Sequence, residues 1–413
     1  MNILTKSNIK NQNISKPLEE ILKEGARKML QAALENEIAE HLESFQNLKD
    51  DKGHRLVIRN GYLPERNIQS GLGLIPIKQP RVRSKEQNNK FTSAILPKYM
   101  RKTPSLEALI PALYLKGIST GSFQEALEAI LGENIKGLSP NTIVKLKQIW
   151  EKEYQTWLQR DLTDKKYVYI WADGIYFNVR LGNDRPCLLV IIGATQDGKK
   201  EIISIYDGIR ESKLSWKEVL QDLKDHGLTA APLLAIGDGA LGFWSALEEC
   251  FSETKQQRCW VHKTANILDK MPKSVQLHAK TKIHEMYMSP SKEKALKAYN
   301  SFLKIYKDKY PKACICLEKD KERLFTFYDF PAVHWQHIRS TNVIESLFAT
   351  IRHRTRQTKG CGSRMTTLSM VYKLAKSAEK KWLKLKGHNL LAKVIKGIKF
   401  KDGLENNKQE NVA

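Results

Sequence analysis

The stretch KYVYIWADGIYFNV at residues 166–179 is the first of three β-rich runs that decide the fold of this chain. The second run is PCLLVIIGATQDG at 186–198 and the third is EIISIYDG at 201–208, and turn residues separate them. A helical pattern follows at 212–227, SKLSWKEVLQDLKDHG, and then a fourth apolar run at 232–239, PLLAIGDG. These patterns predict three strands, a helix and a fourth strand, in that order.

This order of elements is that of an α/β domain with a ribonuclease H-like fold. A further helix, GFWSALEECF at 242–251, and a strand, QQRCWVH at 256–262, continue the alternation of helix and strand. Residues 263–338 carry mostly helical patterns, and a strong helix follows within TNVIESLFATIRHRTRQ at 341–357. We therefore expect a ribonuclease H-like domain that an all-helical insertion interrupts.

A mainly helical region precedes this domain. Residues 18–42 have the apolar spacing of one amphipathic helix, and alternation around residues 72–77 suggests a short strand pair. Residues 105–160 predict three or more short helices. Two of these, SFQEALEAIL at 122–131 and SPNTIVKLKQIW at 139–150, have the length and turn of a helix-turn-helix, although two packed helices in an ordinary bundle would have the same pattern.

The charge of the chain favours a polyanionic partner. Lys and Arg outnumber Asp and Glu by 69 to 45, a formal charge of +24, which indicates nucleic acid before a small neutral substrate. An anionic membrane is disfavoured, because no apolar run approaches twenty residues. The polar N-terminus lacks the apolar core of a secretory signal, and the six scattered cysteines suggest reduced thiols. We expect a cytoplasmic, nucleoid-associated protein.

Two aspartates end apolar runs of the predicted sheet. Asp173 follows one run and Asp238 follows another, and the carboxyl edge of an open α/β sheet is where ligands bind. Each Asp-Gly pair alone is also an ordinary turn dipeptide. Their candidacy as site residues therefore depends on a third acidic residue further along the chain.

Glu345 is that third residue. It lies at the margin of the apolar stripe of the predicted helix within residues 341–357, where Asn342 and Glu345 also have the spacing of a helix cap. Basic residues follow it on the same segment, and they would line DNA phosphates or form a solvated basic face. They are Arg352, Arg354, Arg356 and Lys359.

Phosphodiester chemistry explains why three such carboxylates would be needed together. Two Mg²⁺ or Mn²⁺ ions about 3.5 to 4 Å apart activate an attacking oxygen and stabilise the leaving one, and such hard cations prefer carboxylate oxygens. Without ions, the three carboxylates would repel one another and their pKa values would rise. Asp173, Asp238 and Glu345 are accordingly both the catalytic and the metal-binding candidates, with two ions per site.

Cys259 and His262 form a C-x2-H pair, and Cys314 with Cys316 adds a C-x-C. Structural zinc requires four ligands in closely paired spacing, and the second pair has no histidine partner at finger-like distance. The better alternatives are a buried polar pair that shapes the cleft, or core packing by Cys259 beside a satisfied His262.

Four strings carry a resemblance to a known family: ADGIYFNVR at 172–180, GDGALGFWSAL at 237–247, QRCWVHKTANIL at 257–268 and IRSTNVIESLFATIRHRTRQ at 338–357. In their order and spacing they resemble the Mutator-type bacterial insertion-sequence transposases. The resemblance runs from about Lys16 to Gly387 and includes Glu211 and Ser212 with the downstream Trp216.

The resemblance implies an Asp-Asp-Glu triad, here Asp173, Asp238 and Glu345, acting on terminal inverted repeats and on target DNA. It implies a DNA transposase that cleaves and transfers strands as a homodimer or higher assembly, without a membrane partner. Other expected roles, which come from the resemblance and from the positive charge of the chain, fall into three groups. Cys259, His262 and Asn342 would support the active site, Arg59, Arg81 and Arg83 would join the basic helix in binding DNA, and Trp260 and Trp335 are the candidates for base stacking.

The expected organisation follows from these assignments. It comprises an N-terminal helix and basic strand region (1–104), a helical DNA-binding region (105–160), the first part of the catalytic domain (161–262), the insertion (263–338), the second part with basic C-terminal helices (339–400) and a disordered tail (401–413). Two alternatives remain: a transposase-derived DNA-binding regulator without catalysis, and a nuclease or resolvase of the same fold.

Overall fold

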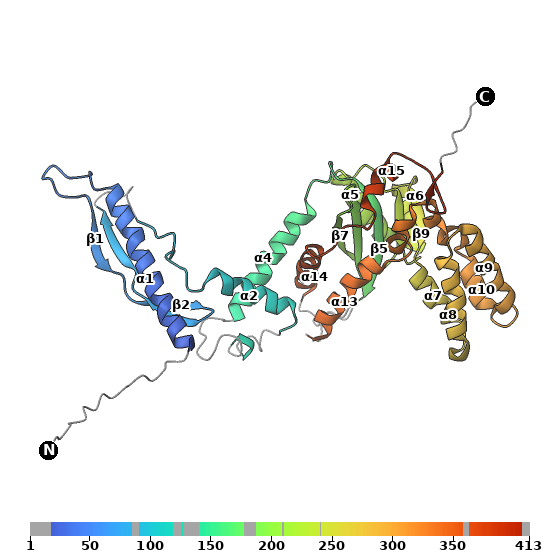
Figure 1. Ribbon diagram of the computed structural model, residues 1–413, viewed down its shortest axis with the longest axis horizontal. Helices are drawn as coiled ribbons and strands as arrows, with labels where there is room; N and C mark the ends of the chain where they lie inside the picture. The colour runs from blue at the N-terminus through green and yellow to red at the C-terminus, as the bar shows by residue number, and fades with distance from the viewer. Residues whose placement is uncertain are drawn as a thin grey trace, which may run out of the picture. The chain divides into compact units, whose positions relative to one another are not determined.

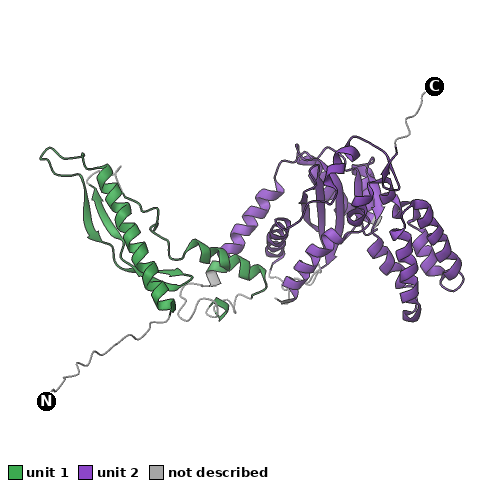
Figure 2. Cartoon of the chain, in the orientation of Figure 1, with its two compact units in different colours: residues 1–143 green, residues 144–413 purple. Residues whose placement is uncertain are grey.

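The computed structural model describes residues 18–84, 91–118, 125–127, 140–176, 187–208, 210–239, 241–357 and 363–406. It divides into two compact units, Met1–Ile143 and Val144–Ala413 (Figure 2). Most of the first helix expected for a helix-turn-helix, at 122–131, lies outside the described residues, as do Lys359 and Cys361.

The first unit is built on one long helix and two strand pairs. Leu34 of the helix packs against Ile68, Ile75 and Ile77 of the strands to form its core. Strands β2 and β3 pair in antiparallel register, which confirms the expected strand pair, and β1 pairs with β4. The elements are α1 (Leu18–Ser44), β1 (Val57–Tyr62), β2 (Arg66–Ser70), β3 (Gly73–Ile77), β4 (Pro80–Ser84) and α2 (Pro104–Leu115).

Among the described residues of the second unit, five strands form one mixed sheet in the order β7-β6-β5-β8-β9. Strand β6 pairs antiparallel with both β5 and β7. Strand β8 runs parallel to β5, and β9 runs parallel to β8. The elements are β5 (Tyr167–Tyr176), β6 (Cys187–Thr195), β7 (Lys200–Gly208), α5 (Lys213–Asp225), β8 (Leu234–Gly237), α6 (Leu241–Cys250) and β9 (Lys255–Arg258).

The two faces of β5 meet different partners, because successive side chains point to opposite sides of a sheet. Ile170 and Ala172 belong to the apolar core that α5 and α6 cover. On the other face, the hydroxyl of Tyr169 lies 2.8 Å from Nδ1 of His334, and Trp171 Nε1 donates to the backbone carbonyl of His337 (2.9 Å). Asp173 shares this second face, and the helix α13 (Asn342–Gln357) contacts β5 and β6.

Helices occupy the remainder of this unit. The segment expected as an insertion contains α7 to α12, and in Figure 1 the helices α7 to α10 form a bundle beside β9. The helices are α4 (Pro140–Leu158), α7 (Trp260–Leu268), α8 (Lys273–Met288), α9 (Lys292–Tyr306), α10 (Pro311–Glu318), α11 (Lys321–Leu324), η3 (Thr326–Asp329), η4 (Ala332–His334), α12 (Trp335–Ile338), α13 (Asn342–Gln357), α14 (Arg364–Glu379), η5 (His388–Leu390) and α15 (Leu391–Ile395).

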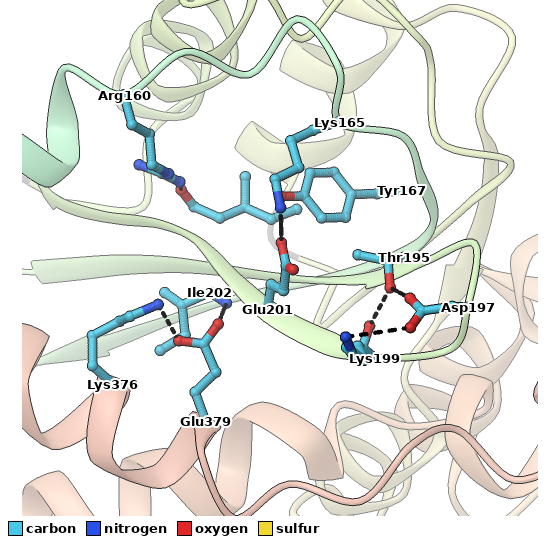
Figure 3. A network of polar contacts seen from close by, with 11 residues as sticks. Arg160, Lys165, Tyr167, Thr195, Asp197, Lys199, Glu201, Ile202, Lys376 and Glu379 are labelled. Atoms are coloured by element: carbon cyan, nitrogen blue, oxygen red, sulfur yellow. Dashed lines mark hydrogen bonds and ion pairs between the residues drawn. The ribbon is translucent and has the colours of Figure 1, made fainter.

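Side chains cover the outer edge strand β7, whose backbone would otherwise offer unpaired groups. Glu379 at the end of α14 accepts a hydrogen bond from the backbone N–H of Ile202 (3.3 Å), and Lys376 pairs with the same carboxylate (Figure 3). Lys165 forms an ion pair of 2.8 Å with Glu201 on the same strand (Figure 3). The hydrogen bond between Glu379 and Ile202 attaches α14 to the sheet.

The C-terminal segment differs from the expected disordered tail in its first six residues. Strands β10 (Phe400–Lys401) and β11 (Leu404–Glu405) form a short hairpin, and Asp402 accepts a hydrogen bond from the backbone N–H of Lys292 (2.6 Å). Phe400 is buried, which explains why this polar segment is ordered. Residues 407–413 lie outside the described residues. In the described parts of the chain, no helix is both long and apolar enough to cross a membrane.

Candidate active site

The pairing of β5 with β8 brings the two candidate aspartates to one edge of the sheet. This parallel ladder ends where Ala172 is opposite Gly237; Asp173 is the next residue of β5, and Asp238 is the first residue after β8. The sequence suggested that Asp173 ends its strand. In the structure it does not, because β5 continues to Tyr176 in antiparallel pairing with β6. Asp173 instead lies where the neighbouring strand β8 stops and the neighbouring strand β6 continues.

Asp173 is 5% exposed, and its two carboxyl oxygens have different surroundings. Oδ1 accepts a hydrogen bond from the backbone N–H of Gly174 (2.9 Å). Oδ2 is buried and has no hydrogen-bond partner among the described residues. Because buried polar atoms are nearly always paired, an unpaired carboxyl oxygen suggests a ligand at this position.

Glu345 reaches the same place from the first turn of α13. Its Oε1 lies 3.3 Å from Nε2 of His262, and its Oε2 accepts a hydrogen bond of 2.9 Å from Arg352. The ligand atoms of Asp173, His262 and Glu345 all lie within 4.8 Å of one another, a separation that would allow them to share a metal ion. Asp238 is outside this trio, although its charge contributes to raising the pKa of Asp173.

The protonation states of the trio follow from burial and hydrogen bonding. Burial raises the pKa of Asp173 to about 8, and the positive charge of His262 only partly offsets this. The hydrogen bond with His262 lowers the pKa of Glu345. Hydrogen bonds to Cys259 and then to Glu345 raise the pKa of His262 to about 11, so its ring is an imidazolium without a free lone pair. In this state the ring of His262 could not ligate a metal ion, and the oxygens of Asp173 and Glu345 are the atoms of the trio that could hold one.

Cys259 and His262 lie at the start of a helix and not on a strand. Cys259 is the N-cap residue of α7, and its backbone N–H donates to the carbonyl of Gly237 on β8 (2.8 Å). Its buried Sγ accepts hydrogen bonds from the backbone N–H and the hydroxyl of Thr341, at 3.3 and 3.4 Å. The same hydroxyl lies 3.4 Å from Nδ1 of His262. This cluster therefore joins β8, α7 and the beginning of α13.

Thr341, and not Asn342, connects the Cys/His pair to α13. The side chain of Asn342 is exposed, whereas Thr341 is completely buried and its carbonyl accepts the backbone N–H of Glu345 (3.1 Å). Sequence reasoning missed Thr341, because a threonine before a helix ordinarily indicates only a cap.

Glu211 is a further acidic residue beside the site. A Cβ added to Gly174 would overlap its carboxyl group, so this side chain lies directly against β5. Burial, followed by the charge of Asp238, raises the pKa of Glu211 to about 7. The sequence resemblance included Glu211, but its position near Asp238 could not be seen from spacing, because the two residues lie on different loops.

The basic residues of α13 have different environments. Arg352 is paired with Glu345, and Arg356 is exposed. Arg354 is only 2% exposed, so no DNA phosphate can reach it in this conformation, which corrects the expectation for this residue. The arginines expected to bind DNA in the first unit, Arg59, Arg81 and Arg83, are exposed on β1 and β4.

The two tryptophans considered for base stacking are packed in the protein. Trp260 is 1% exposed, donates to the carbonyl of Leu324 (2.8 Å) and contacts the ring of Phe325, so it has no face available for a base. Trp335 is partly buried and packs edge-on against Tyr328. The stacking role expected of Trp260 does not fit this structure.

Comparisons with known proteins identify the family. Residues 2–385 match the family described as "Transposase, Mutator family". The transposase for insertion sequence element IST2 of Acidithiobacillus ferrooxidans is 49% identical over 284 residues, which cover 69% of this chain and 96% of that protein. The transposase for IS6120 of Mycolicibacterium smegmatis is 46% identical over 72% of this chain and 92% of its own length. The chain therefore belongs to the Mutator family of transposases.

Proposed function

We propose that this chain is a divalent-metal-dependent DNA transposase with a ribonuclease H-like catalytic domain. Support for the fold comes from the sheet, in which three antiparallel strands are followed by two strands parallel to the first. The helices between β9 and α13 would then be the insertion. The observation that carries the proposal is the approach of Glu345 to Asp173 at the edge of the sheet where Asp238 follows the neighbouring strand.

The residues at this edge fit a divalent metal centre. Asp173 offers a buried carboxyl oxygen without a hydrogen-bond partner among the described residues, and carboxylate oxygens suit Mg²⁺ and Mn²⁺. Asp173, Asp238 and Glu345 would hold two ions. When bound, the ions would activate the attacking oxygen and stabilise the leaving oxygen of a phosphodiester.

The neighbouring residues would orient the glutamate. His262 and Arg352 contact different oxygens of Glu345, which restrains the rotation of its carboxylate. Cys259 and Thr341 in turn restrain the ring of His262. We assign these residues to positioning and not to the reaction itself, since such supporting contacts set the geometry of a metal ligand.

DNA would be the substrate and the main partner. The charge of +24, the exposed Arg356 and the exposed arginines of β1 and β4 support binding of phosphates, with the first unit recognising terminal inverted repeats. Two ends must be joined, so we propose a homodimer or higher assembly on DNA. Binding should weaken with salt, with a slope of log affinity of about −0.9 per neutralised phosphate.

The test is a cleavage and strand-joining assay on DNA that carries the ends of the element, with Mn²⁺, Mg²⁺ or EDTA. We expect metal-dependent joined products for the wild type and none for Asp173→Asn, Asp238→Asn or Glu345→Gln, while end binding persists. Asp225→Asn, which changes an exposed carboxylate at the end of α5, is the matched control.

Three outcomes would contradict parts of the proposal. Mutants that react like the wild type would show that the triad is wrong. Bound ends without any reaction by the wild type would favour a DNA-binding regulator. Cleavage of branched DNA without joining would favour a resolvase.

A further inference from the structure

A second charged site lies on the other side of the loop that carries Asp238. It is a cavity of about 450 Å³, a size that accommodates a small organic ligand, between β9, α7 and α10. The lining residues that matter here are Gly239, Arg258, Lys263, Lys312, Lys319 and Asp320. None of them belongs to the cluster around Asp173 and Glu345.

The inner wall of this cavity has more positive than negative charge. The side chains of Arg258 and Lys263 are 4% and 2% exposed, and both pair with one carboxyl oxygen of Asp320, at 3.4 and 2.5 Å. One carboxylate thus faces two buried cations. A buried cation without a full counter-charge is costly, so this arrangement favours the entry of an anion.

Arg258 also keeps hydrogen-bonding capacity in reserve. Its Nη1 is buried and has no hydrogen-bond partner in the described part of the chain. Guanidinium groups present several N–H donors in one plane, which matches the geometry of phosphate oxygens. Because this donor is buried, Arg258 attracts an anion in the cavity through its charge and not through a direct contact in this conformation.

The outer rim adds further positive charge. Lys312 and Lys319 lie on and just after α10, and both are exposed. Neither forms an ion pair with any of the residues that the structure describes. Lys270, at the end of α7, also lines the cavity and is exposed. Five cations therefore surround the single carboxylate of Asp320.

The cavity is linked directly to the candidate active site through Gly239. This residue follows Asp238 and has a φ of +89°, and a Cβ at this position would overlap the guanidinium of Arg258. Both the left-handed backbone and the close approach require glycine. The Arg258 guanidinium therefore packs against the peptide that follows Asp238, so an anion in the cavity would lie beside the place where the scissile phosphate is proposed to bind.

We propose that this cavity binds a backbone phosphate of the DNA strand, next to the phosphate that is cut. The proposal rests on the proposed function, because it assumes that DNA crosses the sheet edge at Asp238. Lys312 and Lys319 would contact the phosphate at the rim, and the buried positive charges of Arg258 and Lys263 would attract it from the inner wall without touching it. The site would fix the register of the strand without reading its sequence.

The experiment combines protein and DNA changes in a double-mutant cycle. The protein is the full chain carrying Lys312→Gln and Lys319→Gln, and the probe is an end duplex in which single phosphates near the cleavage site are replaced by neutral methylphosphonates. Affinity is measured in EDTA over a range of salt concentrations. The control carries Lys304→Gln and Lys309→Gln, two exposed lysines of the same helical region that do not line the cavity.

We expect the rim variant to bind the unmodified duplex about five- to tenfold more weakly, as for loss of two exposed charge contacts. Its salt slope should fall by about 0.9, the contribution of one phosphate. One methylphosphonate position should weaken binding by the wild type and by the control, but have little further effect on the rim variant.

Two results would overturn the proposal. One is an equal loss of affinity for the end duplex in the rim and control variants, which would show a general charge effect. The other is the absence of any phosphate whose neutralisation is coupled to the rim lysines, which would leave the cavity as a structural ion cluster. Failure of the wild type to bind the end duplex would refute the proposed function, and with it this inference.

Discussion

Replacing Asp173 by asparagine should stabilise the metal-free protein while it abolishes the reaction. Burial raises the pKa of this carboxyl to about 8, compared with 3.8 for a free aspartate. At a pH between these two values, the Asp173 carboxyl is ionised in the unfolded chain but still protonated in the folded chain. The free energy of unfolding therefore falls as the pH rises from about 4 to about 8, and it is constant above that range.

The magnitude follows from the size of the shift. Each pKa unit corresponds to about 1.4 kcal/mol, so at pH 7 the buried carboxyl costs the folded state about 4 kcal/mol. Asparagine resembles the protonated carboxyl and can still accept the hydrogen bond from Gly174. The Asp173→Asn substitution should therefore remove most of this cost to the folded state. A gain of about 4 kcal/mol would raise the melting temperature of a unit this large by roughly 10 °C.

The assay is thermal unfolding of the full chain in EDTA at several pH values between 4 and 8, for the wild type, Asp173→Asn and Asp225→Asn. The advantage of Asp173→Asn should grow with pH and vanish near pH 4, whereas the exposed Asp225 control should follow the wild type. Added Mn²⁺ should raise the melting temperatures of the wild type and of the Asp225→Asn control, but not that of Asp173→Asn. A difference that does not change with pH, or a less stable Asp173→Asn protein at pH 7, would refute the reasoning.

Three further changes test the supporting residues. Thr341→Val removes the hydroxyl that contacts Cys259 and His262, and it should cost about 1 kcal/mol of stability and reduce strand joining more than end binding, as measured by thermal melting and the joining assay. Gly174→Ala should displace the carboxyl group of Glu211, so its effect on joining should not add to that of Glu211→Gln in the double variant. His262→Gln should raise the pKa of the glutamate that His262 contacts, and so shift Mn²⁺ binding measured by calorimetry to higher pH.

Matched substitutions make these results interpretable. Thr350→Val changes an exposed threonine of α13 and should leave joining unchanged. Gly25→Ala, in open space on α1, should be neutral or slightly stabilising because alanine favours a helix. Equal effects from Thr350→Val and Thr341→Val, or additive losses in the double variant of Gly174 and Glu211, would contradict the roles assigned to these contacts.

Much of the second unit could be predicted because its strands are nearly continuous apolar runs with clear turns. The runs that end in Asp173 and Asp238 become adjacent strands, and the helix that carries Glu345 begins three residues before it. The sequence could not show which strands pair beside the ends of these two strands. The β-rich run at 166–179 already extended beyond Asp173, but only the strand pairing shows that β8 stops beside Ala172 while β6 continues along β5 to Tyr176.

The basic helix shows how charge can mislead when it is considered apart from periodicity. Ile344, Leu347 and Ile351 form the buried stripe of α13, and Arg354 follows Ile351 by three residues. Helical geometry therefore puts Arg354 on the buried face. Its expected contact with DNA came from counting positive charges in the segment, whereas the spacing already indicated burial.

The separation of the acidic residues along the chain has a consequence for biosynthesis. Asp173 and Asp238 belong to strands made early, whereas α13, which packs on β5, follows roughly a hundred residues later. At about 5 to 20 residues per second, a ribosome needs on the order of 5 to 20 s to cover that interval. During this time a nascent chain has its first unit and most of its sheet but lacks Glu345. Under the proposed function, a newly made molecule would thus remain inert until nearly all of it has been translated, and a chain terminated before Glu345 would be unable to cut DNA.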